Sequence, residues 1–304
     1  MCWIILQIVV SFAFAPALPS SQYYGQIARA LGGFSTFPGE VIAVAVGSGS
    51  VPNSAVPNSQ ALRELLRDGA PVSAVVIPAG PTTRAAPILR VADAERREIL
   101  LLAQKGDALI FRVRNGAAVL RLRPPLFAVS DAFRMPGGAS DSPATDTLMI
   151  SGRYGPGLVM MRVQQKSTAL QRRYPLSASL GWTLMSPVQW YLSGSGREHL
   201  FTWLWTASLL LPLGLWIPHI GADGARLHSA TSSKNVAIGI GALLGIGLLL
   251  VPYSFGLAAP SISDWLAALC GLGAGAGLAR GFGRERTNYH LSDAAEPITQ
   301  STKD

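Results

Sequence analysis

Four arginines lie close together around one predicted turn. Arg112, Arg114, Arg121 and Arg123 flank Asn115-Gly116, a dipeptide that favours a two-residue hairpin turn. Because strand residues alternate between faces, pairing across this turn places all four arginines on one face and only apolar side chains on the other. Guanidinium groups bind carboxylates and phosphates. The sequence therefore predicts a cationic stripe for acidic glycans, teichoic-type polymers or lipid headgroups, with an ordinary solvated sheet face as the alternative interpretation.

Carboxylates and histidines give little support for catalysis. Glycoside hydrolysis needs two carboxylates that face each other, and no predicted strand carries acids at alternating positions. Asp141 and Asp146, in the loop 136–146, could offer oxygen ligands to Ca²⁺, but without an ordered spacing. No histidine has the spacing of a metal ligand. We therefore expect neither an enzyme nor a bound cofactor, and the sequence assigns no metal.

The charge of the chain is concentrated in one region. Residues 22–199 hold 19 of the 25 Lys and Arg and 11 of the 17 Asp and Glu, and so carry the whole net charge of +8. A basic domain attracts anionic polymers and headgroups, although charge alone identifies no partner. No feature points to nucleic acid. The cysteines, Cys2 and Cys270, both lie in apolar runs, so the basic region has no disulfide framework.

Four apolar stretches can meet a bilayer. The first, residues 3–18, reads as an uncleaved anchor, with a cleaved signal peptide as the alternative. The others, residues 200–217, 236–259 and 262–279, are close to the ~20 residues that span a bilayer. Basic residues of a membrane protein favour the cytoplasmic side, and they occur in the loop 218–234 and after the last stretch. We therefore predict four spans with both termini inside, and residues 22–199 outside the cytoplasm.

Two features of the last apolar stretch could have a function. Gly271 and Gly275 are four residues apart, a spacing that lets helices approach closely in a dimer or in ordinary intramolecular packing. Gly241 with Gly245 and Gly273 with Gly277 repeat this spacing. Asp264 is an acid near the start of the stretch, and an acid within a membrane is a functional candidate by default. Because it lies so near the end, we favour a helix cap, which Ser261 or Ser263 could share.

The region between the first two apolar stretches is rich in predicted β-strands. Short apolar runs separated by turn residues favour a sandwich or barrel over a βαβ fold. The predicted strands are 40–46, 72–77, 87–91, 98–103, 108–114, 118–123, 147–151 and 158–164. One helix is predicted among them, capped by Ser59 and stopped by Gly69, with leucines on one face.

Residues 30–180 resemble laminin-G and concanavalin A-like jelly-roll domains. The resemblance rests on a strand that ends at Asp93, followed by residues 98–114 with a Gln104-Lys105-Gly106 turn. Residues 33–40 and 72–78 fit the opening strands of that family. In bacteria such domains occur fused to VanZ-like membrane segments. The resemblance implies a jelly-roll module that binds carbohydrate or another part of the cell envelope.

The membrane region resembles the VanZ-like family less completely. Asp264 and Gly271 match the spacing of its final motif, but Ala268 stands where the family has asparagine. The Glu and Gln of the family are absent from residues 251–255. This departure puts in doubt whatever the polar residues do in the family. We therefore regard this region as a degenerate VanZ-like bundle.

Together these observations predict an all-β jelly-roll or β-sandwich domain outside the cytoplasm and an α-helical transmembrane bundle. The predicted parts are an anchor or signal segment (1–21), the β-domain (22–195), three spans (196–283) and a disordered cytoplasmic tail (284–304). We expect a bacterial inner-membrane protein that displays a non-catalytic module for envelope glycans or anionic polymers, and a homo-oligomer through the glycine-rich helices is an open prediction. The alternative is a VanZ-like envelope-resistance or transport function of the helices, with the β-domain as accessory.

Overall fold

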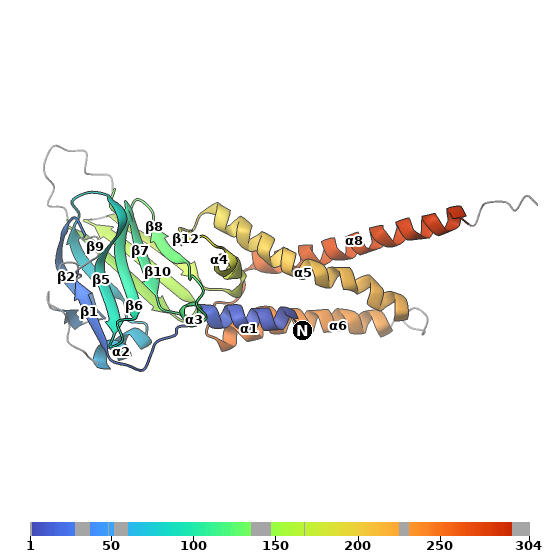
Figure 1. Ribbon diagram of the computed structural model, residues 1–304, viewed down its shortest axis with the longest axis horizontal. Helices are drawn as coiled ribbons and strands as arrows, with labels where there is room; N and C mark the ends of the chain where they lie inside the picture. The colour runs from blue at the N-terminus through green and yellow to red at the C-terminus, as the bar shows by residue number, and fades with distance from the viewer. Residues whose placement is uncertain are drawn as a thin grey trace, which may run out of the picture. The chain divides into compact units, whose positions relative to one another are not determined.

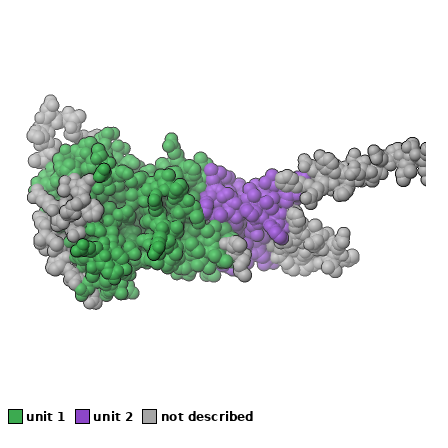
Figure 2. Space-filling model, in the orientation of Figure 1, with its two compact units in different colours: residues 1–201, 247–260 green, residues 202–246, 261–304 purple. Residues whose placement is uncertain are grey.

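The computed structural model describes residues 2–27, 37–47, 49–51, 60–134, 147–166, 168–224 and 231–293. The chain forms two compact units (Figure 2). Unit 1 comprises Met1–Phe201 and Gly247–Pro260, and unit 2 comprises Thr202–Ile246 and Ser261–Asp304.

Unit 1 contains two six-stranded sheets (Figure 1). The first sheet has the order β1-β5-β6-β7-β8-β12. Its strands are β1 (Tyr23–Ile27), β5 (Thr82–Asp93), β6 (Glu98–Gly106), β7 (Ala108–Val113), β8 (Leu126–Val129) and β12 (Tyr191–Leu192). Neighbours are antiparallel except for β12, which runs parallel to β8.

The second sheet has the order β11-β10-β9-β4-β2-β3 and is antiparallel throughout. Its strands are β11 (Thr168–Pro175), β10 (Leu158–Gln165), β9 (Leu148–Gly155), β4 (Val72–Ile77), β2 (Glu40–Val46) and β3 (Gly49–Val51). Alternate residues of β10, such as Val159, Met161 and Val163, are buried, as period-two patterning predicts for a half-buried strand.

The two sheets face each other across a shared apolar core. Phe111 of β7 packs so closely on Gly152 of β9 that a Cβ at Gly152 would lie 2.5 Å from the phenylalanine ring. Phe127 of β8 contacts Tyr174 of β11, with ring centroids 5.5 Å apart. The β-sandwich expected from the sequence is therefore present in the structure.

Most of the predicted elements are confirmed. All predicted strands except 118–123 fall on strands of the structure, and the predicted helix is α2 (Gln60–Arg67). Gly69 follows α2 with φ +71, a conformation that glycine adopts without strain. The proposed cap, Ser59, lies outside the described residues. The sequence interpretation missed β1, β3, β8, β11 and β12.

The predicted hairpin at Asn115-Gly116 is wrong. The chain leaves β7 at Val113 and forms a short helix, α3 (Gly116–Val119), where the second hairpin strand was expected. Asn115 instead forms an isolated β-bridge with Pro16, and the Gly116 amide donates a hydrogen bond to the carbonyl of Ala15. The turn residues are therefore used for a contact with a segment about a hundred residues away, which local pairing rules do not describe.

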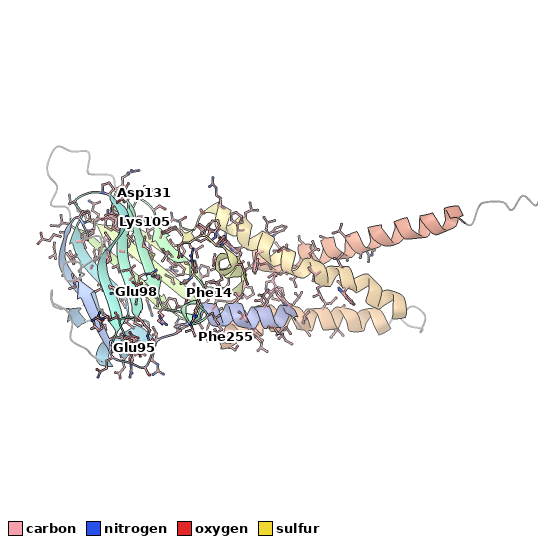
Figure 3. All side chains as sticks on the ribbon, in the orientation of Figure 1. Phe14, Glu95, Glu98, Lys105, Asp131 and Phe255 are labelled. Carbon is pink, nitrogen blue, oxygen red and sulfur yellow. The ribbon has the colours of Figure 1, made fainter. Side chains whose placement is uncertain are left out.

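The first apolar stretch forms α1 (Cys2–Phe14), which packs against α3 and α7 (Val251–Ser254) within unit 1. The side chains of Ala13 and Phe14 are completely buried, and the Tyr154 hydroxyl donates a 2.6 Å hydrogen bond to the carbonyl of Phe14. Figure 3 labels Phe14 at the end of the sandwich where α1 begins to leave it. The choice between an uncleaved anchor and a cleaved signal peptide stays a prediction. At 13 residues, or about 20 Å, α1 is shorter than a span of ~30 Å.

We expect Gly116→Val to detach α1 from the sandwich. A Cβ at Gly116 would lie 2.0 Å from the carbonyl oxygen of Phe12, so any larger side chain must displace α1. Overpacking of this kind costs about 1–3 kcal/mol. The measurement is thermal unfolding of the full protein in detergent, with Gly155→Val as the matched control because a Cβ there meets nothing within 4 Å. Equal stability of the two variants would contradict the expectation that close packing of α1 on Gly116 stabilises the sandwich.

The remaining helices are mainly apolar. They are η2 (Ala178–Gly181), α4 (Trp182–Met185), α5 (Gly196–Gly224), α6 (Thr231–Gly245), the π-helical η3 (Ile246–Leu250), and α8 (Ile262–Asp293). Within the described residues, three helical segments are long and apolar enough to cross a membrane: Gly196–Ile217, Ala237–Ser254 and Ile262–Gly281. They correspond to the second, third and fourth stretches expected from the sequence.

Candidate functional site

A hollow of about 430 Å³ lies on the first sheet. Its apolar floor includes Ile110 of β7 and Ala128 of β8, which are direct partners in the register and are both buried. Because Phe111 faces the second sheet, alternation places Ile110 on the opposite, outer face. Polar side chains of several elements surround this floor: Thr82, Thr83, Lys105, Ser130, Tyr191 and Ser193.

Lys105 and Tyr191 contact each other within the hollow. The ammonium group of Lys105 donates a hydrogen bond to the Tyr191 hydroxyl and lies 4.3 Å from the centre of its ring. Lys105 forms no ion pair with any described carboxylate. The two nearby acids, Asp107 and Asp131, pair instead with Arg134 at 2.7 and 3.7 Å. The hollow therefore presents a positive charge, an aromatic face and hydroxyl groups together.

A turn with a fixed geometry positions Lys105. The side chain of Gln104 is completely buried and donates hydrogen bonds to the carbonyls of Gly80 and Gly106, at 2.8 and 2.9 Å. The Thr82 hydroxyl accepts a hydrogen bond from the Gly106 amide and donates one to the Gln104 carbonyl. Gly106 has φ +60, which favours glycine. These contacts hold Lys105 at the end of β6, over the outer face.

The other side of the hollow is fixed by Glu198 and Tyr174. Glu198, in the first turn of α5, accepts hydrogen bonds from the amide and hydroxyl of Ser193 at 2.7 and 3.0 Å, and so anchors the chain just after β12. Tyr174 donates a 2.6 Å hydrogen bond to the carbonyl of Ala128 in the floor. Burial raises the pKa of Tyr174 to about 12, so this donor stays protonated at physiological pH.

The structure does not bring the four predicted arginines together on a hairpin face. Arg112 lies on β7 and forms an ion pair with Glu98, which also pairs with Arg90 at 3.6 Å. Arg114 follows β7 and is half-buried. Arg121 and Arg123 are exposed beyond α3, and Arg123 donates a 2.9 Å hydrogen bond to the carbonyl of Pro187. Their role in anion binding stays a prediction, although the shared face from which it was inferred is absent.

Glu95, an acid in the turn after β5, is not part of the hollow around Lys105. Glu95 is exposed and pairs with Arg97 at 2.7 Å. Figure 3 labels Glu95 and Lys105 in different parts of the sandwich. Asp141 and Asp146, the proposed Ca²⁺ ligands, lie outside the described residues. Among the residues that are described, no group of three His, Cys, Asp or Glu side chains could hold a metal ion.

The candidate residues of the long apolar helices have structural contacts. Asp264 accepts hydrogen bonds from the amide and hydroxyl of Ser261 at 2.8 and 2.9 Å, and Ser261 precedes α8. This geometry is a capping arrangement, as favoured from the sequence. Gly271 and Gly275 both lie against α5 within unit 2, so this glycine pair serves intramolecular packing.

Comparisons with known families, proteins and structures found no match. The chain matches no protein-family model, no curated protein and no solved structure.

The Gln104-Lys105-Gly106 turn was predictable from the sequence, but the hollow was not. Lys105 and Tyr191 are 86 residues apart, and Tyr191 lies on a strand of only two residues. The only available signal was the turn itself, whose glycine and buried glutamine fix the lysine between them. No pattern indicated that Tyr191 would join the same sheet.

Proposed function

We propose that this chain is a bacterial inner-membrane protein that presents its β-sandwich outside the cytoplasm to bind an acidic polysaccharide of the cell envelope. The observation that carries the proposal is the hollow formed around Lys105 and Tyr191. An aromatic ring stacks on the apolar face of a sugar, hydroxyl groups exchange hydrogen bonds with sugar hydroxyls, and an ammonium group pairs with a uronate or phosphate. The proposal includes a jelly-roll identity of the laminin-G type, supported by the two facing and mainly antiparallel sheets.

The orientation rests on the three long apolar segments. Basic residues in the loop 218–234 and after residue 279 favour a cytoplasmic position for both. The connection after the second of these segments lies against the sandwich, since the Ala258 amide donates a 2.8 Å hydrogen bond to the carbonyl of Leu176. The sandwich and this connection therefore belong on the same side of the membrane, which is opposite to that of the loop 218–234 and the residues after 279. A bundle of these segments in the bilayer is part of the proposal.

We expect Lys105→Ala and Tyr191→Ala each to weaken binding of alginate, a polymer of uronic acids, by about tenfold or more, which corresponds to about 1.4 kcal/mol. The measurement is biolayer interferometry on the full-length protein in nanodiscs at physiological salt, with neutral dextran as the reference polymer. Arg162→Ala is the matched control, because Arg162 is an exposed cation of the second sheet.

The same polymer tests the location of the sandwich. Alginate does not cross a membrane, so fluorescent alginate binds intact spheroplasts only when the hollow faces outward. Binding in nanodiscs without binding to spheroplasts would refute the orientation alone. Wild-type affinity of the Lys105 and Tyr191 variants would refute the site. The alternative, a VanZ-like function of the helices, has no comparable observation in its favour because Asp264 serves as a helix cap.

A further inference from the structure

A second cavity, of about 140 Å³, lies at a different end of the sandwich. It is bounded by both sheets, by the end of α2 and by the chain just after α1 and α7. Ile99, Leu100 and Val113 of the first sheet form one wall, and all three are buried. The cavity therefore opens into the end of the apolar core between the sheets. Figure 3 labels Phe255, one of its lining residues, near the place where α1 leaves the sandwich.

The described side chains around this cavity suit an apolar guest. Tyr154 lines the cavity, but its hydroxyl already donates to the carbonyl of Phe14 at 2.6 Å. Burial raises the pKa of Tyr154, so the residue contributes a neutral ring. A bound water needs two to four polar partners, whereas an apolar cavity of ~150 Å³ takes up a guest the size of benzene. At about 140 Å³, the cavity has room for a guest of about this size, such as the end of an alkyl chain.

The position of the cavity points to the bilayer as the source of this guest. Phe255 and Gly256 directly follow the candidate span Ala237–Ser254, and Pro16 closely follows the apolar helix α1. In the proposed orientation, on which this inference rests, the ends of these apolar helices lie at the level of the lipid headgroups. At the edge of the cavity, Arg67 is exposed and forms no ion pair with a described carboxylate. A guanidinium there complements a phosphate.

We propose that this cavity binds the end of one acyl chain of an anionic phospholipid, whose phosphate pairs with Arg67. The apolar walls accept the chain end, and the cation at the edge selects lipids with net negative charge. A zwitterionic lipid brings its own ammonium group and gains less from Arg67. Such a lipid would fasten the sandwich to the membrane surface, independently of any glycan in the Lys105 hollow.

Photo-crosslinking of the full-length protein in nanodiscs tests this proposal. The probe is phosphatidylglycerol with a diazirine at the end of one acyl chain, and crosslinked peptides are mapped by mass spectrometry. We expect labelling of residues 66–70 and 99–100, at least fivefold above the labelling from phosphatidylcholine with the same diazirine. Labelling confined to α1 and residues 196–281, or equal labelling from both lipids, would overturn the proposal.

Two variants with matched controls test the contributions of Arg67 and of the cavity to lipid binding separately. Arg67→Gln should abolish the preference for phosphatidylglycerol, whereas Arg84→Gln, at an exposed strand position outside the cavity, should keep it. Gly155→Phe adds a ring at a lining position where a Cβ meets nothing within 4 Å, and should reduce labelling at least fivefold. Gly196→Phe, equally unhindered but not at a lining position of the cavity, should not. Unchanged labelling of folded Arg67→Gln and Gly155→Phe variants would also overturn the proposal.

Discussion

Replacing Gly271 or Gly275 by leucine is expected to separate α8 from α5 and to destabilise unit 2. A Cβ at Gly271 would lie 2.1 Å from the carbonyl oxygen of Ala207, and one at Gly275 would lie 2.2 Å from that of Leu211. Backbone oxygens cannot rotate away, so the helices themselves must move. We expect a cost of about 1–3 kcal/mol for each substitution. Thermal unfolding in detergent, followed by helical circular dichroism, measures this loss.

The same helix provides a matched control. Gly273 and Gly277 have the same spacing as Gly271 and Gly275, but a Cβ at either meets nothing within 4 Å. Leucine at these positions should leave the midpoint of unfolding nearly unchanged. Equal losses at Gly271 and Gly273 would show that the cost comes from losing glycine rather than from the close contact. A change of oligomeric state caused by Gly273→Leu alone would instead support the predicted homo-oligomer.

The strands were predictable where their pattern is local. The predicted ranges 40–46 and 72–77 coincide with β2 and β4, because short apolar runs and flanking turn residues define such strands without reference to the rest of the chain. The three long apolar helical segments were predictable for the same reason, since length and hydropathy are local properties. The polar strand β11 carries no such pattern: only Tyr174 among its residues is buried.

The Asn115-Gly116 turn failed because its environment is not local. The sequence preference for a tight turn is real, but α1 approaches Gly116 so closely that only glycine fits. The glycine that suggested a hairpin is thus explained by a helix from the start of the chain. The glycines of α8 show a related limit. Their spacing predicted a close helix contact, but it could not tell that Gly271 and Gly275 face α5 while Gly273 and Gly277 do not.

The hollow around Lys105 depends on pairing that no local rule gives. It needs β12, a strand of two residues, to run parallel to β8. It also needs Glu198, at the start of an apolar helix, to hold Ser193 beside that strand. The contact of Glu198 with Ser193 joins two parts of the chain that were predicted to belong to separate domains.

Asp93→Asn is expected to destabilise the sandwich by about 3 kcal/mol at neutral pH, the upper end of what hydrogen bonds to a charged group contribute. Asp93 is completely buried and accepts hydrogen bonds from the amides of Glu95 and Arg97 at 3.0 and 2.8 Å, and from Nε of Arg97 at 2.7 Å. An asparagine of the same shape retains one oxygen but loses the charge that compensates Arg97. Breaking a charged hydrogen bond at a buried position costs more than a neutral one. Urea unfolding followed by tryptophan fluorescence measures the difference.

The pH dependence of this loss follows from the pKa of Asp93. Burial acts to raise the pKa, but the hydrogen bonds and the charge of Arg97 outweigh it, so the pKa of Asp93 lies below its usual range. A carboxyl with a lowered pKa in the folded state stabilises the fold above the unfolded value of ~3.9, and that contribution disappears as the pH falls through the folded pKa. The difference in the free energy of unfolding between the wild type and Asp93→Asn should therefore become smaller below about pH 4.

Glu95→Gln is the control for Asp93→Asn, because it removes an exposed ion pair with the same arginine instead of a buried one. Glu95 approaches the same arginine at 2.7 Å, but its side chain is 63% exposed, whereas that of Asp93 is 0% exposed. Water screens the exposed pair, so Glu95→Gln should cost less than about 1 kcal/mol. A similar cost for both variants, or a gap for Asp93→Asn that stays constant from pH 7 to pH 3, would mean that the charge of Asp93 does not stabilise the turn between β5 and β6.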